Sequence, residues 1–195
     1  MHRMRQIRIP QDNNNRECCV AGFRQFVTRN DSPEIAIAAA KKAGLAGIEW
    51  AADTHAPHGD LGRAETLMMS TLRAGLTVSA YGSYFRLGAK EPDSFKRILE
   101  TSRHLQAPLI RIWGPQLNCE EPRPEALAAE ARDLADATGN FGISLCLEPH
   151  SFTAFDSYER LAQFIRSLDH PFFKACWAPL PYREKRQTRT VAQSF

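Results

Sequence analysis

The amino-acid sequence predicts an α/β protein built on a parallel sheet. Short apolar runs recur roughly every 30 residues, the length of one strand plus its crossover helix. The strand-like runs begin near Cys18, Gly47, Leu76, Leu109, Ile143 and Lys174. Longer segments with helical signals separate them. This alternation indicates parallel strands with helices packed outside the sheet.

Each predicted helix has start and stop signals of the expected chemistry. The first opens at Asp31 and Ser32, continues with a proline in its first turn, and ends at Gly44. Gly75 ends the second helix in the same way. The helices are predicted over residues 33–44, 61–74, from 92 onwards, 124–139 and 157–168.

Two architectures share this order of elements. One is an incomplete (β/α)8 barrel of about six strand–helix units, and the other is an open parallel sheet with helices on both faces. A full barrel typically takes about 250 residues, so the length of 195 residues favours the open sheet. The dinucleotide fingerprint GxGxxG is absent from the sequence, which disfavours the commonest open-sheet proteins. The repeat pattern therefore leaves both architectures open.

Charge is distributed unevenly along the chain. The net charge is +3, but residues 1–16 and 183–195 each carry +3, which leaves −3 for residues 17–182. A nucleic-acid-binding domain concentrates positive charge on its folded face, so we expect no nucleic-acid partner. We expect a flexible tail over residues 1–16, a folded domain over 17–179 and a disordered basic tail over 180–195.

Cysteine usage and hydropathy indicate the cellular compartment. No apolar stretch approaches the roughly 20 residues that span a bilayer, and the N-terminus lacks the apolar segment of a secretory signal. An odd number of cysteines without a CxxC pair is typical of free thiols in a reducing compartment. They are Cys18, Cys19, Cys119, Cys146 and Cys176. We therefore expect a cytoplasmic protein without a membrane partner.

Alternation along the strands predicts one face rich in charged and aromatic side chains. Aliphatic residues occupy one face of each run and suit the helix layer. The opposite face is predicted to carry Glu49, Tyr81, Arg111, Trp113 and Glu148, each near the C-terminal end of its strand. Active sites of α/β enzymes lie at this edge. A structural ion pair of Arg111 with Glu49 or Glu148 is the alternative interpretation of the same charges.

The loop after the second strand contains an HxxH segment. His55 and His58 are flanked by Asp53 and Asp60, a combination found at metal sites. The alternative interpretation is a polar loop that caps the following helix. The spacing alone does not decide between them.

Six segments of the sequence resemble the sugar phosphate isomerase/epimerase family, whose fold is the xylose isomerase-like TIM barrel. In chain order they are AGLAGIEW, DTHAPHGD, YGSYFRLG, APLIRIWG, LCLEPHSFTAFDSYERL and HPFFKACWAP. Each is short, and the resemblance rests on their order and spacing over residues 17–179. It implies a TIM-type barrel that is truncated after its sixth strand, because PLPYREKRQTRTVAQSF has neither strand nor helix periodicity.

The resemblance also implies a chemistry. In this family a divalent metal at the barrel mouth polarises a sugar carbonyl, and carboxylates move a proton through an enediolate. The metal would be manganese, magnesium, cobalt or zinc. Glu148 aligns with the metal ligand of the fifth strand and would be the catalytic carboxylate. The substrate pocket would be lined by Glu49, His55, Tyr81, Arg86, Arg111, Trp113 and His150.

The sequence departs from the family pattern at its C-terminal end. Ala178 stands where the family has a metal-binding or polar side chain, and the seventh and eighth strands, which bring a histidine and a second glutamate, are missing. With one ligand of four, we expect this chain alone to bind metal weakly and to turn over no sugar.

Three functions are left as hypotheses. The first is a metal-dependent sugar isomerase or epimerase, impaired as this chain. The second is a non-catalytic remnant that binds a sugar or a partner, and the third is an abasic-site endonuclease of the same superfamily. The expected ligand is a sugar or sugar phosphate, and the expected assembly includes a homo-oligomer.

Overall fold

Strands and helices alternate along the whole described part of the chain. The computed structural model describes residues 23–24, 31–89, 92–117 and 123–176. The elements are β1 (Phe23–Arg24), α1 (Pro33–Lys42), β2 (Gly47–Ala51), α2 (Leu61–Arg73), β3 (Thr77–Arg86), α3 (Pro92–His104), β4 (Leu109–Trp113), α4 (Pro124–Gly139), β5 (Ser144–Glu148), α5 (Tyr158–Leu168) and β6 (Phe173–Ala175). The five predicted helices are confirmed. Outside the described residues lie both expected tails, Cys18, Cys19, Cys119 and Ala178.

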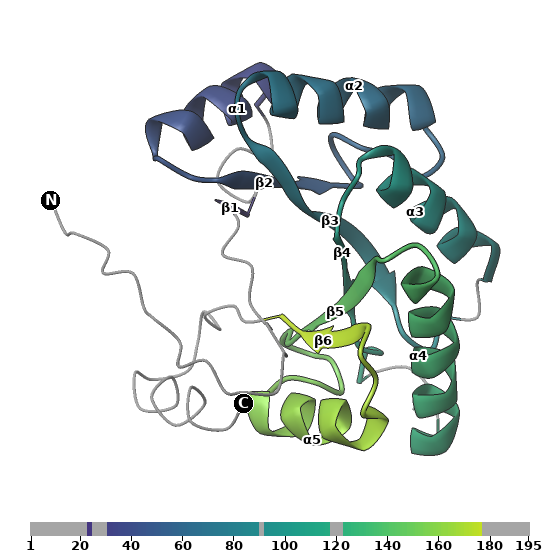
Figure 1. Ribbon diagram of the computed structural model, residues 1–195. Coiled ribbons are helices and arrows are strands. Elements are labelled where there is room, and N and C mark those ends of the chain that lie inside the picture. Colours follow the sequence, from purple (N-terminus) through teal and green to yellow (C-terminus); the bar gives the residue numbers. More distant parts are fainter. Residues whose placement is uncertain (1–22, 25–30, 90–91, 118–122, 177–195) are drawn as a thin grey trace, which may run out of the picture.

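The six strands form one parallel sheet in the order β1-β2-β3-β4-β5-β6. Figure 1 shows this sheet curving, with the helices arranged around its outer side. A doubly wound sheet instead reverses its strand order at a switch point and carries helices on both faces. The described part of the chain therefore has the architecture of an incomplete TIM barrel with six strands and five helices. Within the described residues, β1 and β6 are the edges of the sheet.

Local chemistry places the helix ends where the sequence predicts them. The side chain of Asp60 accepts a hydrogen bond from the backbone N–H of Arg63 at 3.1 Å, which caps α2. Gly44 and Gly75 follow α1 and α2 with φ of +69° and +77°, a backbone conformation that glycine adopts at low cost.

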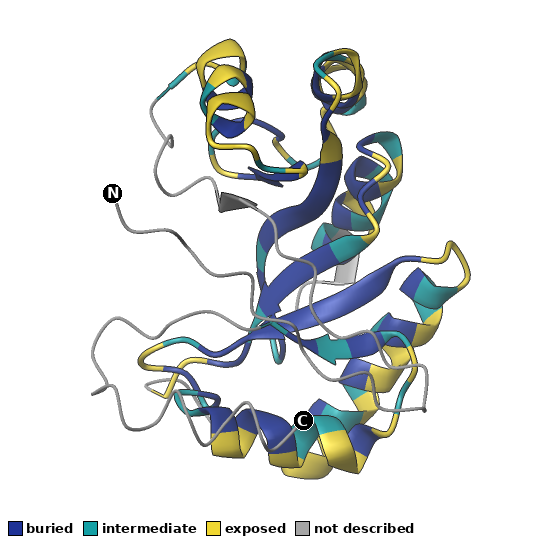
Figure 2. Ribbon diagram, turned by 60° about the vertical axis from the view of Figure 1, so that its left-hand side comes forward, coloured by how far each residue is buried: buried dark blue, intermediate teal, exposed yellow. Residues whose placement is uncertain are grey.

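The hydrophobic core lies between the outer face of the sheet and the helices. Its fully buried strand residues are Ile48, Trp50, Tyr81, Ile110, Ile112, Leu145 and Leu147. Figure 2 shows the buried residues concentrated in the strands and the exposed residues on the outer sides of the helices. Burial of this aliphatic face is the main favourable contribution to folding. No helix in the described ranges is long and apolar enough to cross a membrane.

A bulge in β3 changes which side chains of this strand face the interior. Ile48 pairs with Val78, but Glu49 pairs with Ala80, so Ser79 is an extra residue in the ladder. Tyr81 consequently pairs with Trp50, a core residue on the helix side. The alternation prediction was wrong for Tyr81 because this one-residue insertion inverts the faces beyond it.

A second irregularity follows in the same strand. Gly82 pairs with Arg111 and Arg86 pairs with Trp113, so β3 has three intervening residues where β4 has one. Tyr84, in the middle of this segment, has a φ of 59°, in the left-handed region. The two irregularities together let the ten-residue β3 present Gly82, Tyr84 and Arg86 near the end of β4.

Candidate functional site

A row of three charged side chains crosses the inner face of the sheet. Glu49 comes from β2, Arg111 from β4, and Glu148 is the last residue of β5. Arg111 Nε donates to Glu49 Oε1 at 2.8 Å, and Arg111 Nη1 donates to Glu148 Oε2 at 2.6 Å. The exposed fractions of Glu49, Arg111 and Glu148 are 8%, 4% and 5%. We call these three residues the charged row.

Arg111 is a permanent cation at the centre of the charged row. Burial by itself would lower the pKa of its guanidinium, but the attraction of Glu49 and then of Glu148 outweighs this and raises the pKa above its ordinary value. Buried charges require such pairing, because an isolated charge is costly to remove from water. The alternative interpretation of the sequence, a buried ion pair, is therefore present, and it includes both glutamates.

An aromatic cluster adjoins Glu148. Trp113 Nε1 donates to Glu148 Oε2 at 2.9 Å. The edge of Tyr84 packs on the Trp113 ring with centroids 5.0 Å apart, and the ring of His150 lies 4.7 Å from that of Trp113. The guanidinium of Arg86 lies 4.7 Å from the centroid of Trp113. Trp113 thus connects the charged row to a group of polar and aromatic side chains at the strand ends.

Gly82 provides the space that the charged row needs. A Cβ atom at this position would lie 2.6 Å from Arg111 Nη2 and 2.8 Å from Glu49 Oε1. Any other residue would push the guanidinium or the carboxylate away. Neither Gly82 nor Tyr84 was identified from the sequence. The available signal was a glycine inside a strand-like run, which indicates a bulge or a close approach.

The remaining candidate residues of the β2–β3 region make their hydrogen bonds with the loop after β2 and with the segment before α1. Tyr81 is fully buried and its hydroxyl donates to the carbonyl oxygen of Ala56 at 2.7 Å. His58 Nδ1 lies 2.8 Å from the same hydroxyl. His55 Nε2 lies 2.8 Å from the carbonyl oxygen of Asp31, and its Nδ1 lies 2.9 Å from Thr54 Oγ1. Both ring nitrogens of His55 therefore have partners within the protein.

The HxxH segment is a polar loop in this structure. Asp60 is used as the cap of α2, and His58 packs against Tyr81 with ring centroids 5.8 Å apart. No group of three or more His, Cys, Asp or Glu side chains within the described ranges is placed to hold a metal ion. The loop interpretation of the sequence is thus the one that fits the contacts.

The charged row does not fit the divalent metal that the family resemblance implies. Glu148 is the predicted ligand, but its Oε2 accepts hydrogen bonds from both Arg111 and Trp113. The nearest paired charge is a guanidinium, which repels a second cation. The residues described therefore form an ion-paired site rather than a metal-ligand set.

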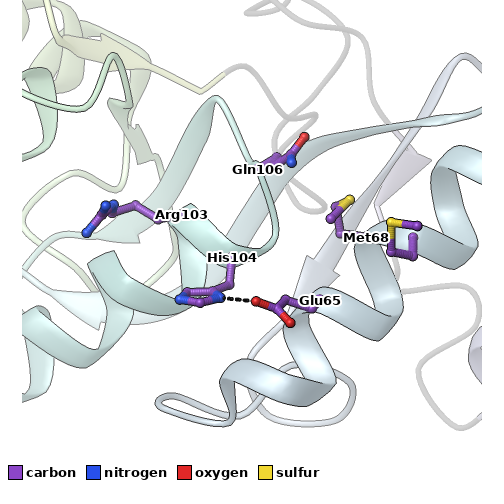
Figure 3. Close-up of a pocket in the computed structure, with 6 residues that line it drawn as sticks. Glu65, Met68, Arg103, His104 and Gln106 are labelled. Carbon is purple, nitrogen blue, oxygen red and sulfur yellow. Dashed lines mark hydrogen bonds and ion pairs between the residues drawn. The ribbon is translucent and has the colours of Figure 1, made fainter.

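A surface hollow lies between α2 and α3, away from the charged row. It is lined by Glu65, Met68, Met69, Arg103, His104 and Gln106. Figure 3 shows His104 pointing toward Glu65, and their atoms Nδ1 and Oε1 lie 2.7 Å apart. Both helices belong to the outer layer, so this hollow does not contribute to the strand-end site.

Solved structures with the same fold include proteins of different activities. A probable 3-DHS dehydratase, AsbF, from Bacillus anthracis is 17% identical with a TM-score of 0.66, and the match covers 79% of this chain and 61% of that one. A 3-keto-D-glucoside 4-epimerase, YcjR, from E. coli is 15% identical with a TM-score of 0.61, covering 79% and 66%. A xylose isomerase-like TIM barrel protein from Mycobacterium smegmatis in complex with magnesium is 14% identical with a TM-score of 0.59, covering 85% and 69%.

This chain spans 61% to 69% of the length of these three structures. At such low identities the likeness shows the fold alone. A search of curated proteins gave no match. The sequence model of one family, described as xylose isomerase-like TIM barrel, matches residues 37–180. Since this match covers most of the chain and agrees with the observed fold, the protein belongs to the xylose isomerase-like TIM barrel family.

Proposed function

We propose that this protein is a sugar isomerase or epimerase, impaired as this chain, whose site moves a proton at a carbon next to a carbonyl group. The observation that carries this proposal is the charged row, in which Trp113 is bonded to Glu148 at the C-terminal ends of β4 and β5. The ligand would be a sugar or sugar phosphate. An epimerase of keto-sugars among the solved structures with this fold supports the same class of substrate.

The chemistry of the cluster suits a polyhydroxylated ligand. Carboxylate oxygens accept from sugar hydroxyls, and a guanidinium donates to hydroxyl, carboxylate or phosphate oxygens. Indole and phenol rings such as those of Trp113 and Tyr84 offer apolar faces together with a polar tip. A few polar groups that converge beside aromatic rings are typical of small-molecule sites. Arg86 and His150 remain proposed substrate-binding residues next to this cluster.

In the proposed reaction Glu148 is the group that moves the proton. Its carboxylate takes a proton from the carbon next to the carbonyl and, in an isomerase, returns it to the neighbouring carbon on the same face. In an epimerase a second acid on the opposite face of the sugar would have to return the proton. Arg111 and Trp113 fix the orientation of this carboxylate. The fixed positive charge of Arg111 also offsets negative charge that develops on the substrate oxygen.

The experiment is deuterium exchange at carbons next to the carbonyl, followed by NMR on a panel of ketoses, aldoses and their phosphates in D₂O. We expect slow exchange with at least one sugar, without net conversion to another sugar because this chain is expected to be impaired, and loss of exchange in Glu148→Gln. Glu65→Gln is the matched control because Glu65 lies on α2, with its side chain 58% exposed, away from the charged row. Exchange that persists in Glu148→Gln, or no interaction with any sugar of the panel, would contradict the proposal.

A non-catalytic sugar-binding protein is the second candidate. It is favoured by the engagement of both carboxylates with Arg111, which leaves Glu148 already paired. Sugar binding without any deuterium exchange would identify this case. No observation at the described strand ends favours the abasic-site endonuclease. The cytoplasmic location and the homo-oligomer stay predictions.

A further inference from the structure

We propose that Arg111 is the built-in cation of this site and holds Glu49 and Glu148 together without a divalent metal. The inference deepens the proposed function, since it rests on the charged row being the sugar site and says which cation that site uses. It follows from the disagreement between the metal implied by the resemblance and the contacts that the two carboxylates make.

The contacts show that Arg111 serves both carboxylates. Its Nε contacts Glu49 Oε1 at 2.8 Å and its Nη1 contacts Glu148 Oε2 at 2.6 Å, distances of charge-assisted hydrogen bonds. Because two different nitrogens are used, one guanidinium bridges the carboxylates of β2 and β5. This bridging is what a divalent cation does when it binds two carboxylates.

The positive charges in and around the cluster already match or exceed the carboxylates without a metal. Glu49 and Glu148 are two carboxylates, and the guanidiniums of Arg111 and Arg86 are two cations at its centre and beside Trp113. Lys174 shares the inner face by register, since it pairs with Cys146, which pairs with Arg111. A dication added here would leave an excess of positive charge in a buried place, where repulsion is weakly screened.

The space around the guanidinium is also filled. The glycine at position 82 leaves room for the guanidinium, since a Cβ there would approach Arg111 Nη2 to 2.6 Å and one of the two groups would have to shift. Glu148 Oε2 already accepts from two donors, Arg111 and Trp113. A metal ion at this oxygen would have to displace at least one of these donors and would then lie beside the guanidinium.

The experiment compares the response to manganese of the wild-type protein and three variants, by calorimetry and by thermal unfolding with and without MnCl₂. Arg111→Leu removes the cation, Arg111→Leu/Glu148→Gln removes one carboxylate as well, and Arg73→Leu is the control on the exposed end of α2. We expect no stoichiometric manganese binding by wild type or Arg73→Leu. Arg111→Leu should bind manganese at least about tenfold more tightly than wild type. Its melting temperature, lowered by the substitution, should rise again when MnCl₂ is added. The double variant should lose both effects.

Stoichiometric manganese binding by the wild type that disappears in Glu148→Gln would overturn the inference. If Arg111→Leu does not fold, Arg111→Lys decides the question, because it keeps a cation and should stay insensitive to manganese. Manganese binding by Arg111→Lys would equally overturn the inference.

Sugar binding measured with and without a chelator of divalent metal ions separates this inference from the proposed function. Sugar binding that survives the chelator supports both the proposed function and the role of Arg111 as the cation. Sugar binding that the chelator abolishes overturns only the role of Arg111. If no sugar binds under either condition while the manganese results hold, the proposed function fails and the built-in cation stands.

Discussion

The two sides of the same strands hold two very different polar clusters. On the inner face, Glu49, Arg111 and Glu148 form a buried row of full charges. On the helix side of β3, Tyr81 and His58 form a hydrogen-bonded pair at the loop after β2. The sequence places Glu49, Tyr81 and Arg111 on one face, but a single bulge at Ser79 separates Tyr81 from the other two. The face of the sheet, rather than residue type, decides which polar group belongs to the site.

The two clusters also differ in how strongly each member depends on its partner. Removing one member of a buried ion pair leaves an uncompensated charge in a low-dielectric place. Removing one member of a neutral hydrogen bond leaves only an unpaired dipole. Substitutions in the charged row should therefore reduce stability more than substitutions in the Tyr81–His58 pair.

The largest effect is expected for Arg111→Leu. Without the guanidinium, Glu49 and Glu148 are two buried carboxylates with no shared cation, and the loss should be about 3–5 kcal/mol in the free energy of unfolding. Urea denaturation in the absence of divalent ions measures this. Arg73→Leu on the exposed end of α2 should change stability by no more than roughly 0.5 kcal/mol. Equal effects of the two substitutions would mean that the charged row is not formed.

Gly82→Ala should have the next largest effect. Its Cβ would meet Arg111 Nη2 at 2.6 Å and Glu49 Oε1 at 2.8 Å, so the ion pair must shift, at a cost of about 1–3 kcal/mol. Gly62→Ala is the matched control, because no atom lies within 4 Å of a Cβ at this position in α2. That change should stabilise the helix by about 0.5–1 kcal/mol. Chemical denaturation that shows both alanines to be neutral would remove Gly82 from the site.

The sequence suffices to predict those parts of the site that regular strand pairing fixes. Glu148 pairs with Trp113 and Cys146 pairs with Arg111 in an unbroken β4–β5 register, so counting every second residue gives the correct face. The periodicity of apolar runs and the capping residues likewise predicted the helices and the parallel sheet, because both follow from local chemistry.

The parts that could not be predicted depend on backbone irregularities. Ser79 adds one residue to β3, and Tyr84 adopts a φ of 59° between Gly82 and Arg86. Neither feature has a hydrophobic pattern of its own. His55 lies in a turn where no periodicity applies, and its contact with the carbonyl oxygen of Asp31 joins residues that are 24 positions apart. The environment of a loop histidine is therefore set by such tertiary contacts and cannot be predicted from its neighbours in sequence.

The substitution Tyr81→Phe tests the hydrogen-bonded Tyr81–His58 pair on the helix side of β3. The hydroxyl that bridges Ala56 and His58 is lost, which should lower the free energy of unfolding by about 1–2 kcal/mol. Sugar affinity should stay unchanged, because Tyr81 faces the helix layer, whereas Trp113→Phe should weaken it by removing the donor to Glu148. Isothermal titration of both variants with the same sugar makes the comparison. A loss of affinity in Tyr81→Phe alone would return this tyrosine to the site.

The smallest effect is expected from the protonation of His58. Burial lowers the pKa of His58 below its ordinary value of 6.5, and the charge of Arg97 lowers it further, while the backbone of Ser83 acts in the opposite direction. Below the ordinary pKa the unfolded chain binds a proton that the folded chain resists, so stability should fall as the pH drops through this range and stay constant above it. His58→Gln removes the titrating group and keeps a side chain that can donate to the Tyr81 hydroxyl. In melting curves, the stability of the wild type relative to His58→Gln should therefore fall between about pH 8 and about pH 5, with the difference at the upper pH as the internal reference. Curves that stay parallel over the whole range would show that His58 is as accessible to protons in the folded protein as in the unfolded chain.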